Sequence, residues 1–362
     1  MESNVVSQLE TIMRKYNFEI ENVELNPYYI SFIVKDKKEN KENFIKLCNE
    51  LKTENRLPFM RKRKDGKVAI SIVESTTPKR RSDSKMMMIL LLATILTVSL
   101  DFLQRYNGIV VLNKLIGRQS SFLIDFSEYT LAFLLIFGLH EIGHKVMATL
   151  YGIPTRGPFF IPGIPGLIPT FGAVIFQEGI PRNRDELFDI GFSGPFFGFI
   201  SATAITVFAV KEAVPIRIED FQSLLQTSGF IEMQPIVDVV ARLLKPVGSG
   251  YTLIMGLLGF PVWLAFLVTF INMFPAAQLD GGHMARAVFG EKGHKILTII
   301  SLVVYALMGF WLMALFVALT WKFEGHPGPL DDVSEVSTAT KIKAIIGLAM
   351  FLLSATIIPL TF

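Results

Sequence analysis

Six long stretches of almost uninterrupted apolar residues constrain this chain more than any other feature. Each has close to the ~20 residues that a helix needs to cross a bilayer. Hydrophobic residues make up 51% of the chain, too large a share for an ordinary soluble protein. The sequence therefore predicts a multi-span α-helical membrane protein with about six transmembrane helices, an even number that places both termini on one side. The stretches lie near residues 86–104, 124–150, 187–210, 252–274, 296–320 and 343–361.

The first 85 residues contain no such stretch and combine helical with strand patterns. Apolar residues recur at helical spacing in two segments. Phe18–Leu25 and Tyr29–Val34 have the composition of strands, and a second pair of strands is joined through Asp65-Gly66, a strong hairpin signal. We expect residues 1–85 to form a soluble α+β domain of order α-β-β-α-β-β ending in a basic linker, followed by a membrane-embedded domain, residues 86–362.

Basic residues at the end of this domain predict its side of the membrane. Lys79, Arg80, Arg81 and Lys85 adjoin the first apolar stretch, which favours a cytoplasmic position in a cell membrane. The chain starts with polar residues, so neither a signal peptide nor a transit peptide is expected. The basic run Arg61–Lys64 has the charge to contact anionic lipid or nucleic acid, but a solvated hairpin tip is the favoured interpretation, and no nucleic-acid partner is expected.

The second apolar stretch carries His140, Glu141 and His144 in its last part. Residues four apart lie on one face of a helix, so His140 and His144 can offer two imidazole nitrogens to one metal ion. In this H-E-x-x-H arrangement the Glu takes a proton from the metal-bound water. Burying these groups in lipid is costly unless they are paired or metal-bound, which weighs against ordinary core histidines. Cys48 is the only cysteine, so the metal must be held by His and carboxylate.

A second informative segment, Ile271–Met284, follows the fourth stretch. Pro275 breaks the helix there and frees backbone groups at membrane depth. Asp280 is the favoured third ligand, which leaves a fourth tetrahedral position open, as in catalytic zinc sites. Asn272 offers amide donors for the oxyanion of a tetrahedral intermediate. The alternatives are a helix-capping role for Asp280 and an interhelical hydrogen bond from Asn272.

The other histidines rank lower as metal ligands. His283 is a rival third ligand because it lies only three residues beyond Asp280. His294 and His326 lie outside the apolar stretches and have no metal-ligand spacing. The small residues Gly191, Gly194 and Gly198 in the third stretch are interpreted as helix packing.

The segment Gly152–Pro181 is rich in Pro and Gly, which deny it a regular helix, yet it is too apolar for a solvated loop. We expect it to dip into the membrane against protein. Phe171–Phe176 has the composition of an extended strand whose open edge, beside the metal helix, can accept a peptide as an extra strand. A packed interfacial loop is an equally good interpretation.

The motifs at His140–His144 and Asn272–Gly282 resemble those of the site-2 protease family of intramembrane metalloproteases, in its archaeal or plastid-type form. The resemblance implies a zinc held by His140, His144 and Asp280, with Glu141 as catalytic base and Asn272 near the scissile peptide. It also implies cleavage of transmembrane helices, often after another protease has shortened the substrate. The chain shows no recognisable PDZ or CBS module. The matching segments are His140–His144, Asn272–Gly282, Gly194-Pro195 and His326–Asp332.

The expected function is therefore that of a zinc metallo-endopeptidase that takes transmembrane-helix protein substrates from the lipid bilayer. An ion-coupled transporter also places His, Glu and Asp at broken helices, but no repeat relates the two halves of this chain. A proteolytically inactive relative that only binds membrane proteins is the other alternative. An intact Glu141 beside the ligand candidates weighs against it.

Overall fold

The computed structural model describes residues 2–37, 40–75, 83–115, 117–220, 233–323 and 326–356. Its N-terminal region has the expected order α-β-β-α-β-β, with one antiparallel sheet in strand order β1-β2-β4-β3. Apolar side chains from both helices and the sheet, such as Met13, Phe32 and Phe44, form its core. The elements are α1 (Glu2–Lys15), β1 (Ile20–Asn26), β2 (Tyr29–Val34), α2 (Asn40–Thr53), β3 (Arg56–Lys62) and β4 (Val68–Glu74).

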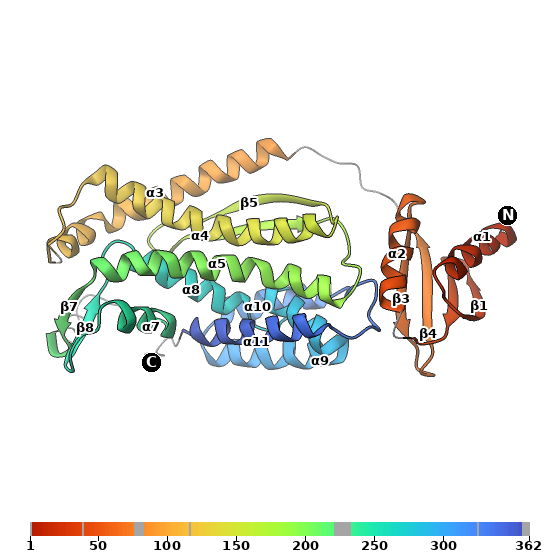
Figure 1. The fold of residues 1–362 in the computed structure, drawn as a ribbon. Coiled ribbons are helices and arrows are strands. Elements are labelled where there is room, and N and C mark those ends of the chain that lie inside the picture. Colours follow the sequence, from red (N-terminus) through yellow and green to blue (C-terminus); the bar gives the residue numbers. More distant parts are fainter. Residues whose placement is uncertain are drawn as a thin grey trace.

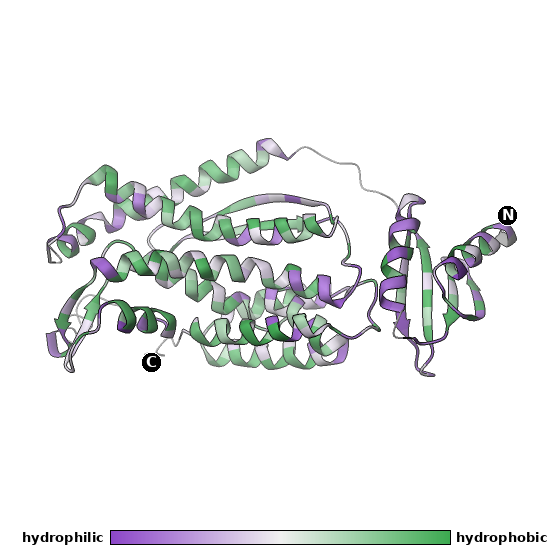
Figure 2. Cartoon of the chain, in the orientation of Figure 1, coloured by the Kyte–Doolittle hydropathy of each residue, from purple (hydrophilic) through white to green (hydrophobic). Residues whose placement is uncertain are grey.

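The rest of the chain is a bundle dominated by apolar helices (Figures 1 and 2). Three helices in the described residues have the length and composition to cross a membrane: α3 (Ser84–Leu115), α4 (Phe122–Leu150) and α5 (Arg184–Glu212). Lys79, Arg80 and Arg81, on which the expected orientation depends, lie outside the described residues. A membrane protein is therefore confirmed, whereas the expected count of six spans is not.

The remaining helices are shorter or interrupted. The fourth stretch yields a helix of only 14 residues because its start forms a strand and a turn. The helix after it, α9, is interrupted at Gly290, where φ is 69°. The elements are β7 (Val214–Arg217), α7 (Pro235–Leu244), β8 (Tyr251–Ile254), α8 (Gly259–Asn272), α9 (Asp280–Leu307), α10 (Trp311–Phe323) and α11 (Thr338–Leu353).

The fifth stretch, 296–320, is a hairpin and not one span. Helix α9 ends at Leu307 and α10 starts at Trp311, with Gly309 in a left-handed conformation (φ 81°) between them. The fifth stretch therefore runs along the bundle twice, once in α9 and once in the opposite direction in α10. Helix α11 therefore starts beside Asp185, where Thr340 donates a hydrogen bond to the carboxylate. It ends beside Gln234, whose amide donates to Thr356.

This path corrects the expectation that both termini lie on one side. Asp185 stands at the start of α5, next to the N-terminal region, and pairs with Lys41 of that region. Gln234 precedes α7, which packs on the far end of α5. The last described residues thus lie at the opposite end of the bundle from the N-terminal region (Figure 1). The expectation was wrong because hydropathy alone does not reveal a tight turn inside an apolar stretch.

The Pro- and Gly-rich segment forms an antiparallel hairpin, β5 (Thr155–Ile164) and β6 (Ile168–Gln177). The predicted extended conformation of Phe171–Phe176 is confirmed. The hairpin packs between α3 and α4: the ring of Phe137 on α4 lies against Gly172, and Thr97 on α3 donates a hydrogen bond to Pro169. Only β5 pairs with β6 in this sheet, so the other edge of β6 carries no strand among the described residues.

The N-terminal region is seated on the loop that joins α10 to α11. The backbone amide of Met60 on the edge strand β3 donates to Leu330 (2.9 Å), and the amide of Asp332 donates back to Met60 (3.2 Å). The side chain of Leu330 is buried in the core of the N-terminal region. Asp332 pairs with Arg286 of α9 through two hydrogen bonds of 2.8 and 2.6 Å. The loop that contacts the N-terminal region is therefore connected to α9, the helix that begins at Asp280.

Candidate metal centre

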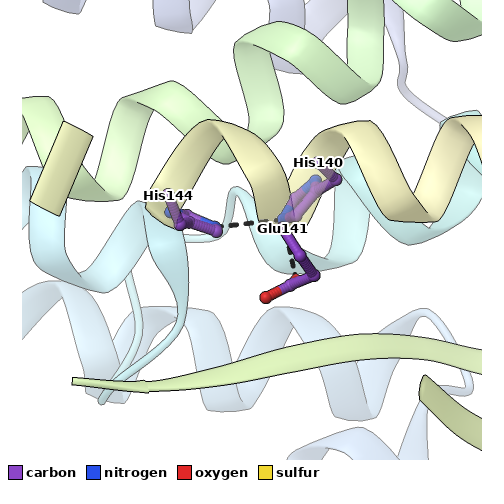
Figure 3. A group of neighbouring side chains, drawn as sticks. All are labelled: His140, Glu141 and His144. Carbon is purple, nitrogen blue, oxygen red and sulfur yellow. Dashed lines mark hydrogen bonds and ion pairs between the residues drawn. The ribbon is translucent and has the colours of Figure 1, made fainter. Parts of the chain in front are cut away.

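Helix α4 presents the three expected side chains together. The Nε2 atoms of His140 and His144 lie 3.2 Å apart, and a carboxylate oxygen of Glu141 lies 3.8 Å from His140 Nε2. Figure 3 shows the two rings pointing toward one another, with the Glu141 side chain next to that of His140. All three residues are buried, at 9%, 7% and 6% exposure for His140, His144 and Glu141. A helix face that is buried against protein thus carries a concentrated set of metal donors.

Asp280 reaches the same point from a segment 140 residues further along the chain. Its Oδ2 atom lies 3.1 Å from His140 Nε2, and its Oδ1 atom lies 3.2 Å from His144 Nε2. It is the first residue of α9, directly after the turn between α8 and α9, in which Ala277 has a positive φ of 44°. The break expected at Pro275 thus delivers a carboxylate between the two imidazoles.

These donors fit a zinc ion. Ligand distances of ~2.0–2.1 Å in a tetrahedron correspond to ligand-to-ligand separations of about 3.3 Å. The separations of 3.1, 3.2 and 3.2 Å among the three donor groups match that geometry. His144 Nδ1 lies 2.7 Å from the carbonyl of Ile190, to which it donates. A neutral His144 therefore directs the lone pair of Nε2 at the Asp280 carboxylate, an arrangement of two acceptors that repel one another unless a cation lies between them.

Two supporting contacts were not foreseen from the sequence. The Ile190 carbonyl fixes the His144 ring, and the Ile175 backbone of β6 lies beside the Glu141 carboxylate. Asn272 donates its amide to Asp280 Oδ2. This is the interhelical hydrogen bond that the sequence analysis kept as an alternative for Asn272, and it orients the carboxylate. Backbone partners such as Ile175 and Ile190 leave no pattern in the sequence, because any residue type supplies the same groups.

The small residues of α5 leave space for the side chains of the metal centre, which is a more specific role than general helix packing. A Cβ atom at Gly194 would lie 2.0 Å from His144 Nε2, and one at Gly198 would lie 2.9 Å from His140 Nδ1. At Gly191 the added atom would lie 2.9 Å from the Asp280 carbonyl. The spacing 191, 194 and 198 follows one helix face. That spacing was the available signal that this face of α5 makes room for the histidine rings.

The three other histidines form a separate group. His283 Nδ1 lies 2.9 Å from His326 Nε2, and His294 Nε2 lies 2.9 Å from the Ala277 carbonyl. The amide of Gly328 donates to His326 Nδ1 at 3.0 Å. Each of these rings thus has a hydrogen-bond partner outside the metal centre, and the rival ligand His283 is directed to His326.

Comparison with known proteins places the chain in a family. The profile described as Peptidase family M50 matches residues 128–316. The chain is 31% identical to the probable zinc metalloprotease EGY2, chloroplastic, of Arabidopsis thaliana over 228 residues, 61% of this chain and 39% of the relative. It is 29% identical to the probable zinc metalloprotease EGY1, chloroplastic, of Oryza sativa subsp. japonica over 248 residues, 61% of this chain and 38% of the relative.

The alignments with EGY2 and EGY1 thus cover about two fifths of the length of those relatives. No solved structure matches the chain. The profile match covers both segments that carry the metal donors, α4 and the start of α9, and it extends over more than half of the chain. The resemblance to the site-2 proteases is thereby confirmed: the chain belongs to Peptidase family M50.

Proposed function

We propose that this protein is an intramembrane zinc endopeptidase that hydrolyses peptide bonds in or near transmembrane helices of membrane-protein substrates. His140, His144 and Asp280 hold the zinc in this proposal, and Glu141 is the general base. The observation that carries it is the convergence of three donor groups within 3.2 Å of one another inside a bundle of apolar helices. Membership of a peptidase family and the names of the relatives support the same activity.

When bound, zinc lowers the pKa of a coordinated water and polarises the peptide carbonyl. Glu141 is placed to accept the proton of the attacking water at its carboxylate and to pass it to the leaving amine nitrogen. The backbone of Ile175 on β6 lies beside that carboxylate. Asn272 orients Asp280 with one amide hydrogen and retains a second for the developing oxyanion.

The substrate chain is proposed to lie along β6. A transmembrane helix hides its carbonyls in internal hydrogen bonds, so it must unwind before hydrolysis. The edge of β6 that carries no strand offers backbone partners to an extended peptide, and Ile175 places that strand beside Glu141. Helix-breaking residues in the substrate therefore matter more than side-chain identity.

The activity is tested with Glu141→Gln in the purified chain, using a single-span model substrate. The amide can hydrogen-bond to water but cannot accept its proton, so we expect unchanged zinc content and a loss of cleavage of about 10²–10⁴-fold. Cleavage within tenfold of the wild type removes Glu141 from the role of base. Absence of cleavage by a zinc-loaded wild type supports an inactive binding relative. Ion flux that depends on Asp280 and Glu141, without cleavage, supports the transporter.

We further propose that the N-terminal region and the metal centre face the cytoplasm of a cell membrane, with residues 1–85 as a domain and 86–362 as the membrane-embedded part. The proposal depends on the basic linker, since the structure contains no bilayer. It treats α8 with the first half of α9 as a further crossing, and α11 as another. A cysteine introduced in residues 1–85 of a Cys48→Ser chain should resist an impermeant thiol reagent in intact cells. Labelling from outside reverses the orientation.

A further inference from the structure

A large cavity lies at the end of the membrane region remote from the N-terminal region. Its volume is about 880 Å³, and its wall is made by α3, α7, α8 and β8. Lys245, which lines it, donates a hydrogen bond to the carbonyl of Lys211 at the far end of α5. Among the described residues, none of the metal-centre side chains lines the cavity. It is therefore separate from the metal centre.

One part of the wall is apolar and adjoins membrane-facing surface. The cavity is lined by Ile109 and Leu112 of α3, Val237 of α7 and Phe260 of α8. On α3, the apolar side chains of Leu103 and Val111 are 52% and 61% exposed. Apolar side chains exposed on a membrane-spanning helix face lipid. A molecule in this cavity thus has access to the acyl region of a bilayer.

Another part of the wall is basic. Arg105, Arg242 and Lys245 line the cavity against a single lining carboxylate, Asp238. The Arg105 guanidinium is held by Asp101, 2.9 Å from its Nε atom, and lies 3.8 Å from the centre of the Phe260 ring. Arg242 is exposed at the rim. Fixed guanidinium groups favour phosphate, because they donate two parallel hydrogen bonds to its oxygens.

We propose that this cavity binds one anionic phospholipid. The phosphate group lies among Arg105, Arg242 and Lys245, and one acyl chain follows the apolar wall between α3 and α8. The volume is in the range of ligand pockets in proteins. The apolar wall and the basic residues together select an amphiphile over a free anion.

The test is lipid binding to the purified, detergent-solubilised full chain, followed by native mass spectrometry. Phosphatidylglycerol and phosphatidylcholine with identical acyl chains are the probes. We expect a preference of about tenfold for phosphatidylglycerol, the effect of one charge-assisted contact. Arg242→Glu should remove this preference.

Arg217→Glu is the matched control, since Arg217 is an exposed basic residue of β7 that does not line the cavity. Unchanged zinc content and circular dichroism confirm that each variant is folded. Equal binding of the two lipids, or an equal loss in Arg217→Glu and Arg242→Glu, overturns the proposal. Displacement of the lipid by millimolar inorganic phosphate overturns it in favour of a soluble anion site.

Discussion

Two groups of histidines lie at the same end of the membrane region, and their partners differ. His140 and His144 direct their Nε2 atoms at each other and at a carboxylate, all within 3.2 Å. His326 instead accepts from the amide of Gly328 at Nδ1, so its Nε2 is the donor to His283 Nδ1. The first group thus has a carboxylate between two ring nitrogens, whereas the rings of the second group are paired with each other and with the backbone.

The second group is therefore a structural one. Burial, with the neighbouring His283 and His294, lowers the pKa of His326 to about 2, so this ring is neutral at physiological pH. The second group lies beside Arg286. Arg286 binds Asp332 of the loop that contacts the N-terminal region. Proximity of imidazoles therefore does not by itself define a metal site. The observed difference is that the carboxylate of Asp280 lies within 3.2 Å of both ring nitrogens of the first group.

The largest effect should come from closing the space around the first group. Gly194→Ala puts a methyl group 2.0 Å from the present position of His144 Nε2 and must displace that ring. We expect zinc content to fall and cleavage to drop by at least about 100-fold, since a shift of about 1 Å in a catalytic group has that cost. The control is Gly108→Ala on α3, whose added methyl group meets nothing within 4 Å. Full activity of Gly194→Ala contradicts the geometry of the centre.

A change beside the second group should cost stability and leave the metal in place. Asp332→Asn removes the charge that pairs with Arg286, whose side chain is only 3% exposed. Breaking a buried ion pair in this way destabilises by about 3–5 kcal/mol. Thermal unfolding in detergent should shift down while zinc stays at the wild-type ratio. Loss of zinc at full stability contradicts a purely structural role for this side of α9.

Acid should reveal the same ion pair. Burial acts to raise the pKa of Asp332, but the hydrogen bond and charge of Arg286, with Arg184, hold it below its ordinary value. The pair therefore contributes its full stability above the ordinary Asp pKa of about 3.9 and loses it as pH falls through the lowered pKa. The difference in melting temperature between wild type and Asp332→Asn should be constant from neutral pH down to that value and shrink below it. A difference that shrinks between pH 7 and 5 contradicts the assignment.

The smallest effect is expected at His326. His326→Gln loses the acceptor for Gly328 or the donor to His283 and should destabilise by about 1–2 kcal/mol. Zinc content and cleavage per folded molecule should remain within about twofold of wild type, because the ring contacts no metal donor. A His326→Gln chain that folds normally but loses zinc would show that the second group takes part in metal binding, and would contradict its purely structural role.

Local patterns were sufficient for much of this architecture. The 3.6-residue period places His140 and His144 on one face of a helix, and Asp65-Gly66 predicts the β3–β4 hairpin. The turn at Gly309 was not predictable by hydropathy, because the residues on both sides are equally apolar. The Leu330–Met60 pairing and the contact of Gly194 with His144 join segments far apart in the sequence, which local periodicity does not reveal.

The proposed activity depends most directly on which side chains hold the metal. We would measure zinc per chain by elemental mass spectrometry in wild type, Asp280→Ala and His283→Ala, each purified as the folded full chain. We predict one zinc per chain in the wild type and in His283→Ala, and little or none in Asp280→Ala. Zinc that is retained in Asp280→Ala and lost in His283→Ala would contradict the assignment of the metal centre.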